Sequence, residues 1–403
     1  MNSSDYIHLE NTYGAQNYKP LDVVVSRAEG VWVWDVEGRR YMDCLAAYSA
    51  VNQGHCHPRI LETLTEQAHR ATLTSRAFRN DQLARLYQSL NRISGYGRVL
   101  PMNTGSEAVE TAIKAARLWG YRVKGIPADK AEILVFDGNF HGRTTTIVGF
   151  SSEPAYREGF GPFTPGFRLL PYGDAAAVRN AVTENTCAIL VEPIQGEAGI
   201  IIPPAGYLAE LAQIAAGANV LLMADEIQSG LGRTGKMFAF EHEGVRPDVL
   251  IIGKALSGGF YPVSAILAED KVMDVFTPGS HGSTYGGNPL GAAIACTALD
   301  VLLDEHLVEN SAELGEYALQ RLRGITADHI VEVRGRGLWI GIEVTPESGG
   351  ARPFCEALRN ESILCKDTHG TVIRFAPPLS ITRQELDWAL ERVEKVLRAG
   401  PAR

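Results

Sequence analysis

Val249-Leu-Ile-Ile-Gly-Lys-Ala-Leu-Ser-Gly-Gly259 places a lysine between four apolar residues and a small, flexible segment. A short apolar run that ends in glycine is typical of a strand buried on both faces of a parallel sheet. Three further runs have this form: Ile133-Leu-Val-Phe136, Ala188-Ile-Leu-Val191 and Val220-Leu-Leu-Met-Ala224. Helical periodicity, clearest over residues 107–121, appears between or beside the runs. The sequence therefore predicts an α/β fold with a mostly parallel sheet covered by helices.

A smaller α+β domain is predicted toward the C-terminus. Residues 330–344 form two strand-like segments around a glycine-rich turn, which is typical of an antiparallel pair. Thr382 and Glu385 have the spacing of a capping box, and an apolar stripe at helical spacing follows them. We expect an N-terminal segment over residues 1–48, a large domain over 49–293 and a small domain over 294–403.

Composition narrows the class of protein. The chain has 403 residues, 45% of them hydrophobic, and a formal charge of -9, so it is too large for a small binding module and has no broad basic surface. We therefore expect no nucleic-acid partner. No apolar run reaches membrane-spanning length and no leader pattern opens the chain, so we expect no membrane partner and a cytoplasmic location. Six scattered cysteines predict reduced thiols, and His55-Cys56-His57 predicts a turn rather than a metal site.

Lys254 and Asp225 are the first candidates for chemistry, because each comes just past a buried strand, where ligand groups collect in open α/β sheets. A lysine amine in a partly desolvated pocket loses its proton more readily and can form a Schiff base with a carbonyl. A carboxylate such as Asp225 can keep a protonated ring nitrogen charged. The alternatives are a solvated lysine and a helix cap.

Three loops offer backbone that can approach a ligand. Thr104-Gly105-Ser106-Glu107 precedes a helix and can bind phosphate, or simply cap that helix. His141 lies in a glycine-flanked loop shortly after a buried strand, although an isolated histidine is more often structural. Gly230-Leu-Gly-Arg-Thr-Gly-Lys-Met237 partly matches two phosphate-loop motifs, but Met237 replaces the hydroxyl residue that binds magnesium, which argues against a nucleotide site.

Taken together, the sequence resembles the class III pyridoxal-phosphate-dependent aminotransferases, and within them the members that act on ornithine. The resemblance extends along nearly the whole chain. The segments that carry it are Tyr13-Gly-Ala-Gln-Asn-Tyr18, Tyr48-Ser-Ala-Val-Asn-Gln-Gly-His-Cys-His-Pro58, Leu73-Thr-Ser-Arg-Ala-Phe78, Pro101-Met-Asn-Thr-Gly105, Glu192-Pro-Ile-Gln-Gly-Glu-Ala-Gly199, Ala224-Asp-Glu-Ile-Gln228, Gly253-Lys-Ala-Leu-Ser-Gly-Gly259, His281-Gly-Ser-Thr-Tyr-Gly-Gly-Asn-Pro-Leu290 and Ile373-Arg-Phe-Ala-Pro-Pro378.

This resemblance implies a fold-type-I homodimer with shared active sites and pyridoxal 5'-phosphate as cofactor. It implies that Lys254 binds the cofactor and shuttles a proton, while Asp225 contacts the pyridine nitrogen. The other cofactor-binding residues that it implies are Gln228 at the phenolic oxygen, Gly105 and Ser106 at the phosphate, Phe140 and Ile227 on the ring faces, and Thr284 at the phosphate of the neighbouring subunit.

For the substrates, the resemblance implies that Tyr18, Tyr48 and Arg143 receive the α-amino and carboxylate end of ornithine. Its distal amine would then point at the cofactor. Arg374 matches the arginine that binds the α-carboxylate of 2-oxoglutarate or glutamate, and Glu197 matches the acid that pairs with this arginine when ornithine is bound. A guanidinium suits a carboxylate through paired hydrogen bonds, and a movable acid can mask it.

Two alternatives stay open at this point. Another ω-aminotransferase of the class, acting on acetylornithine, 4-aminobutyrate or lysine, would share Lys254 and Asp225 but need not share Tyr18 and Tyr48. A non-catalytic protein on the same fold is the second alternative, and the intact set of Lys254, Asp225 and Gln228 argues against it.

Overall fold

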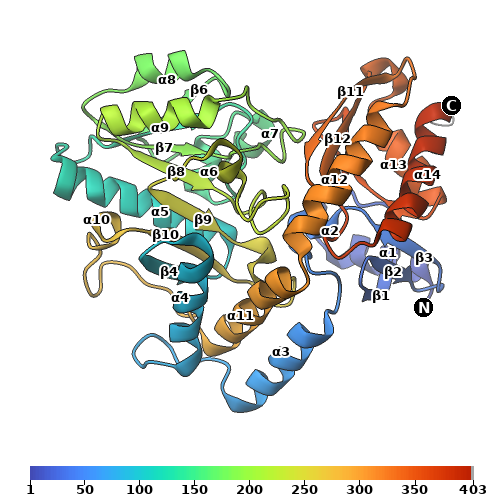
Figure 1. Cartoon of the computed structure of the whole chain (residues 1–403), viewed down its shortest axis with the longest axis horizontal. Helices are drawn as coiled ribbons and strands as arrows, with labels where there is room; N and C mark the ends of the chain where they lie inside the picture. Colours follow the sequence, from blue (N-terminus) through green and yellow to red (C-terminus); the bar gives the residue numbers. More distant parts are fainter. Residues whose placement is uncertain (401–403) are drawn as a thin grey trace.

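A seven-stranded sheet forms the centre of the large domain in the computed structural model, which describes residues 1–400 (Figure 1). The sheet order is β4-β10-β9-β8-β7-β5-β6. The strands are β4 (Arg98–Met102), β5 (Glu132–Phe136), β6 (Phe167–Leu170), β7 (Thr186–Val191), β8 (Leu221–Asp225), β9 (Val249–Ile252) and β10 (Ser264–Ala268). Only β10 runs against its neighbours, so the predicted mostly parallel sheet and its four apolar strands are confirmed.

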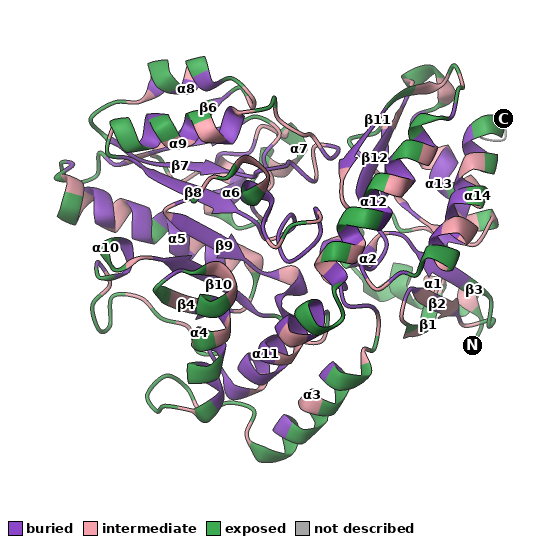
Figure 2. Cartoon of the chain, in the orientation of Figure 1, coloured by how far each residue is buried: buried purple, intermediate pink, exposed green. Residues whose placement is uncertain are grey.

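Both faces of this sheet are covered by helices, and the strand residues alternate between the two layers. Leu221 and Met223 of β8 pack in the cluster that contains α5, whereas Leu222 and Ala224 pack in the larger cluster on the other face. Figure 2 shows the strands buried and the outer helix faces exposed. The large-domain helices are α3 (Pro58–Arg70), α4 (Asp81–Ser94), α5 (Gly105–Trp119), η1 (Gly120–Lys124), α6 (Thr145–Gly149), α7 (Pro154–Arg157), α8 (Ala175–Ala181), α9 (Tyr207–Gly217), η2 (Ala239–Glu243), η3 (Lys254–Ser257), α10 (Asp270–Met273) and α11 (Pro289–Asp304).

The C-terminal part is built on an antiparallel sheet of order β11-β12-β15-β14. Its strands are β11 (Ile330–Arg336), β12 (Trp339–Val344), β14 (Lys366–Thr368) and β15 (Val372–Phe375), and its helices are α12 (Leu307–Arg323), η4 (Pro346–Ser348), α13 (Arg352–Asn360) and α14 (Arg383–Ala399). The predicted strand pair and the capping box of Thr382 and Glu385 are both confirmed. The α12 helix begins directly after the turn that follows α11, beside the large domain (Figure 1).

The N-terminal segment joins the C-terminal part through a third sheet of order β1-β2-β3-β13. It contains α1 (Ser3–Tyr13), β1 (Val25–Glu29), β2 (Trp32–Asp35), β3 (Arg40–Asp43) and α2 (Ala46–Ser49), and the partner strand is β13 (Ile363–Leu364). Both chain ends therefore lie on the same side of the molecule (Figure 1). The boundary expected between residues 293 and 294 falls inside α11, and the domain limits stay predictions.

Within residues 1–400, no helix is long and apolar enough to cross a membrane, and no group of three candidate ligands is placed to hold a metal ion. The six cysteines are free thiols, five of them buried. His55 and His57 point to different carboxylates, Asp43 at 2.8 Å and Glu305 at 3.0 Å. This divergence agrees with the turn predicted from the sequence.

Candidate active site

The candidate nucleophile and base, Lys254, stands where β9 ends and η3 begins, next to Gly253. Its backbone has φ of 45°, in the left-handed region that side chains rarely adopt, so the surrounding structure holds it in a strained conformation. Desolvation lowers the pKa of its ammonium group, although the charges of Glu197 and Asp225 act in the opposite direction. A lysine with a lowered pKa gives up and takes up a proton more readily than a solvated lysine.

Asp225 ends the neighbouring strand β8 and is held by two hydrogen bonds. Its Oδ2 lies 2.6 Å from His141 Nδ1, and its Oδ1 accepts from the backbone N–H of Ile227 at 3.0 Å. Burial disfavours charge on His141, but the hydrogen bond and the charge of Asp225 outweigh burial and raise the pKa of this histidine. Sequence reasoning favoured a structural role for His141, and only the folded chain reveals that it touches Asp225.

Glu192 is a second buried acid beside this pair that sequence reasoning did not single out. Its carboxylate accepts the backbone N–H of Phe140 at 2.9 Å. Burial raises the pKa of Glu192 to about 7, with His141 lowering it and Asp225 raising it. Its place in Glu192-Pro-Ile-Gln, just past β7, was the one signal that could have found it, since Lys254 and Asp225 also follow strand ends.

The buried Arg374 and the partly buried Glu197 form an ion pair on the small-domain side of the site. Arg374 Nη2 donates to Glu197 Oε1 at 2.9 Å and to the carbonyl of Gly196 at 2.9 Å, while Nη1 donates to Gln228 Oε1 at 3.0 Å. Burial disfavours the Glu197 carboxylate, but the charges of Arg374 and then Lys254 lower its pKa. Arg374 Nε is buried without a hydrogen-bond partner in residues 1–400.

Aromatic side chains border this ion pair. The Tyr48 ring lies 5.5 Å from the Arg374 guanidinium and belongs to α2, where residues 46–49 all have positive φ. Tyr18 is close enough to affect the Tyr48 hydroxyl electrostatically, yet 76% of it is exposed. Arg143 lies 3.6 Å from the ring of Tyr156, which sequence reasoning missed, and 5.5 Å from the ring of Phe140.

The start of α5 provides a place for an anion. Thr104 caps the helix in a capping box with Glu107, which satisfies the Glu107 N–H and leaves the backbone N–H groups of Gly105 and Ser106 without intrahelical partners. Glycine allows close approach here: a Cβ on Gly105 would lie 3.1 Å from Ile227 Cδ1, and one on Gly142 only 2.2 Å from Ser106 Oγ. Among the cofactor-binding candidates, Thr284 alone is exposed, on the loop before α11.

Comparison with known proteins identifies the family that shares these features. The sequence profile described as aminotransferase class-III matches residues 13–397. The chain belongs to the class III aminotransferases. The ornithine aminotransferase of Brevibacillus brevis is 57% identical over 385 residues, which cover 96% of each chain. A crystal structure of the ornithine aminotransferase from Toxoplasma gondii has a TM-score of 0.98 at 44% identity and covers 99% of this chain and 95% of that one. The acetylornithine aminotransferase of Elizabethkingia anophelis has a TM-score of 0.90 at 48% identity, covering 98% of this chain and 99% of that one.

An aminotransferase of this class uses pyridoxal phosphate, and the residues of this chain fit that cofactor. The open helix start at Gly105 and Ser106 suits a phosphate dianion. Asp225 suits a protonated ring nitrogen, because two hydrogen bonds leave part of its four lone-pair sites free. Lys254 would supply the amine for the cofactor's aldehyde. Ile227 follows Asp225 and contacts the position of a Cβ on Gly105, so it lies between the acid and the anion site.

Proposed function

We propose that this aminotransferase moves the distal δ-amino group of L-ornithine to 2-oxoglutarate, giving glutamate 5-semialdehyde and glutamate. The observation that carries the proposal is the Arg374–Glu197 pair next to Lys254, since it can present two charge states to two substrates. The names of relatives at 57–58% identity over nearly the whole chain support the same substrate.

The ion pair explains how one site accepts two substrates. The reacting end of 2-oxoglutarate carries a carboxylate beside the keto carbon, and Arg374 can bind it once Glu197 turns away. The reacting end of ornithine is a methylene amine without a carboxylate, so Glu197 stays on Arg374 and neutralises it. Leaving a buried guanidinium unpaired would cost roughly 3–5 kcal/mol. The site therefore favours a substrate carboxylate whenever Glu197 has turned away from Arg374.

At the other end of ornithine, Tyr18, Tyr48 and Arg143 bind the α-amino and α-carboxylate groups. Arg143 offers a planar guanidinium to that carboxylate, and its stacking on Tyr156 restricts its motion. The tyrosine hydroxyls complete the polar contacts, and desolvation raises the pKa of Tyr48, so it stays a hydrogen-bond donor at neutral pH. This arrangement directs the δ-amine toward Lys254.

Pyridoxal phosphate, when bound, supplies the aldehyde that takes up amino groups and a ring that accepts an electron pair. The protein supplies the rest. Lys254 carries the proton that leaves the substrate carbon, Asp225 holds a positive charge on the ring nitrogen, and His141 fixes Asp225 by the 2.6 Å hydrogen bond. Gly105 and Ser106 would hold the phosphate, Phe140 and Ile227 would lie on the ring faces, and Gln228 would contact the phenolic oxygen.

We also propose that the enzyme is a homodimer that works in the cytoplasm, at a step linking arginine degradation to proline biosynthesis. The helix α1 has no buried residue, and Tyr13 at its end and Tyr18 beyond it are largely exposed. Apolar side chains that lie open on one chain are suited to burial against a second copy. In such a dimer the exposed Thr284 reaches the phosphate of the neighbouring subunit's cofactor.

A steady-state assay tests the proposed substrate. The purified holoenzyme is given 2-oxoglutarate with L-ornithine, N-acetylornithine, 4-aminobutyrate or L-lysine in parallel, and glutamate formation is followed. We expect the largest kcat/KM with ornithine. Preference for N-acetylornithine, the substrate named for the E. anophelis relative, would replace ornithine and leave the aminotransferase assignment intact. Absence of turnover with all four amines would favour a non-catalytic protein.

A further inference from the structure

The glycine-rich loop over residues 230–237, which partly resembles a phosphate loop, packs instead on the small domain. A Cβ on Gly235 would lie 2.8 Å from Ala312 Cα of α12. A Cβ on Gly337, in the turn between β11 and β12, would lie 2.6 Å from the backbone nitrogen of Gly235. The glycines therefore allow two backbones to meet without side chains between them. The motif serves a domain junction.

Arg233, in the middle of this loop, extends its side chain into the junction and is completely buried. Its Nη1 donates to the carbonyls of Leu338 at 2.8 Å and Pro377 at 2.7 Å, and its Nη2 donates to Asn52 Oδ1 at 2.5 Å. All three acceptors are neutral oxygens, so within residues 1–400 the guanidinium has hydrogen-bond partners but no ion-pair partner. Burial lowers its pKa to about 9. Burying a charge costs several kcal/mol unless hydrogen bonds offset the cost, and Arg233 Nε has no partner within residues 1–400.

The acceptors lie close in sequence to two substrate-binding residues. Pro377 comes three residues after Arg374, and Asn52 comes four residues after Tyr48. A backbone hydrogen bond from Leu379 N–H to the Asn52 carbonyl, at 2.7 Å, links the same two segments directly. Asn52 Nδ2 also donates to the Leu231 carbonyl at 3.0 Å, which returns the network to the glycine-rich loop.

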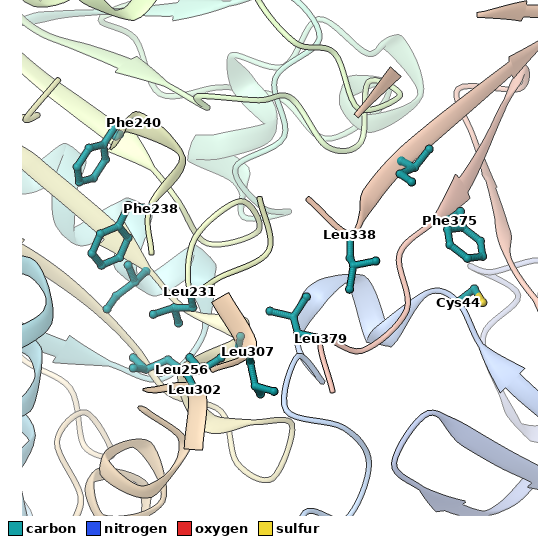
Figure 3. Close-up of a cluster of buried hydrophobic side chains, with 14 of the residues drawn as sticks. Cys44, Leu231, Phe238, Phe240, Leu256, Leu302, Leu307, Leu338, Phe375 and Leu379 are labelled. Atoms are coloured by element: carbon teal, nitrogen blue, oxygen red, sulfur yellow. The ribbon is translucent and has the colours of Figure 1, made fainter. Parts of the chain in front are cut away.

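Apolar side chains enclose this network. Leu231, Leu338 and Leu379 are each at most 1% exposed and belong to the loop, the β11–β12 turn and the segment after β15. Figure 3 shows Leu338 and Leu379 between the large-domain side chains around Leu231 and Phe238 and the small-domain side chain of Phe375. Water is excluded from the hydrogen bonds of Arg233, so they are stronger and more directional than on the surface.

We propose that Arg233 is a positioning residue that fixes Tyr48 and Arg374 relative to each other by tying their chain segments to the large domain. This inference rests on the proposed function, because it concerns where the substrate carboxylates are held. Arg233 touches no reacting atom. Its effect comes from geometry, since a shift of about 1 Å in a binding group can cost roughly 100-fold in rate.

Arg233→Lys in the holoenzyme tests the proposal, with Arg321→Lys as the matched control. Lysine keeps the charge but has no fork to reach acceptors on two sides. Arg321 donates to Asp387 and Glu394 inside the small domain, away from the junction, so its replacement affects that domain's stability alone. Binding of glutarate, a dicarboxylate that cannot react, is measured by calorimetry, and hydrogen exchange is followed at the Leu379 amide.

We expect Arg233→Lys to weaken glutarate binding at least about tenfold. It should also raise KM for 2-oxoglutarate by a larger factor than it lowers kcat. The Leu379 amide should exchange faster in this variant, and Arg321→Lys should change none of these values. Glutarate affinity and Leu379 exchange equal to wild type in a folded Arg233→Lys would overturn the proposal. If Arg233→Lys does not fold, Asn52→Ala replaces it as the test, because this variant removes one hydrogen-bond acceptor of Arg233. A raised KM for ornithine would support the positioning role, and an unchanged KM would reject it.

These readouts separate the proposal from the proposed function. If the wild-type enzyme does not turn over ornithine, the proposed function is wrong. The difference in Leu379 amide exchange between wild type and Arg233→Lys still tests the positioning role of Arg233. If the wild-type enzyme turns over ornithine and Arg233→Lys has unchanged glutarate affinity and Leu379 exchange, only the positioning role is wrong.

Discussion

Gly315 lies in the middle of α12, and replacing it with alanine should destabilise the enzyme even though alanine is the better helix former. A Cβ at this position would lie 2.1 Å from the carbonyl carbon of Gly337. Gly337 cannot retreat, because backbone atoms of Arg233, Thr234 and Gly235 lie within 2.7 Å of its own Cβ position on the other side. The turn between β11 and β12 is therefore held between α12 and the glycine-rich loop.

The size of the effect follows from these distances. Ordinary contact for a Cβ begins at 3.4 Å, so α12 and the turn would have to separate by about 1.3 Å. Overpacking of this kind typically costs about 1–3 kcal/mol and sometimes more. The gain in helix propensity from glycine to alanine is about 1 kcal/mol. We expect a net loss of about 1 kcal/mol, and of about 2 kcal/mol if the overpacking cost is at the upper end. A lower kcat/KM should accompany it because the junction near Arg233 is displaced.

Gly217 is the matched control, since it ends α9, has no heavy atom within 4 Å of its Cβ position and has no positive φ. Gly217→Ala should leave stability unchanged or raise it by up to about 1 kcal/mol. The assay is thermal unfolding of both holoenzyme variants at equal cofactor concentration, followed by kcat/KM for ornithine. A Gly315→Ala enzyme as stable as Gly217→Ala would refute the reasoning about the backbone contact.

Four further outcomes test the site. Lys254→Ala should abolish turnover and leave the circular dichroism spectrum unchanged; multiple turnovers would remove Lys254 from its role. Tyr18→Phe should raise KM for ornithine more than for 2-oxoglutarate, and equal changes would contradict the binding pose. His141→Asn should lower kcat with both substrates by roughly ten- to a hundredfold through loss of a charged hydrogen bond to Asp225. Burial raises the pKa of Glu226 to about 7, so the folded state holds a proton that the unfolded state releases near 4.5, and stability falls as pH rises between these values. Glu226→Gln should therefore unfold with a shallower pH dependence between pH 5 and 8, a difference of up to about 3 kcal/mol.

The central strands were predictable because their residues are buried on both faces, which leaves an uninterrupted apolar run. The edge strand β4 gave no such signal. It contains Pro101, which cannot donate to a strand ladder and fits only because β4 pairs with β10 alone at the sheet edge. The reversed direction of β10 was equally hidden, because a buried apolar run has no property that distinguishes the two directions. Helix limits shifted as well: the helix expected from residue 107 begins at Gly105, and a π-helical turn follows it from Gly120.

Some residues of the candidate site could be predicted from the sequence and others could not. Lys254 and Asp225 could be picked out from local sequence because each follows an apolar run, and parallel strands bring their ends to one edge. Contacts between distant segments had no local signal. His141 and Asp225 are 84 residues apart, and Arg233 reaches acceptors as far as Asn52 and Pro377. The glycines around Arg233 partly match a phosphate-loop motif, and this pattern is the same whether the backbone meets a phosphate or another backbone. Only the fold distinguishes them, because it places Gly337 against Gly235 and leaves no space for a ligand there.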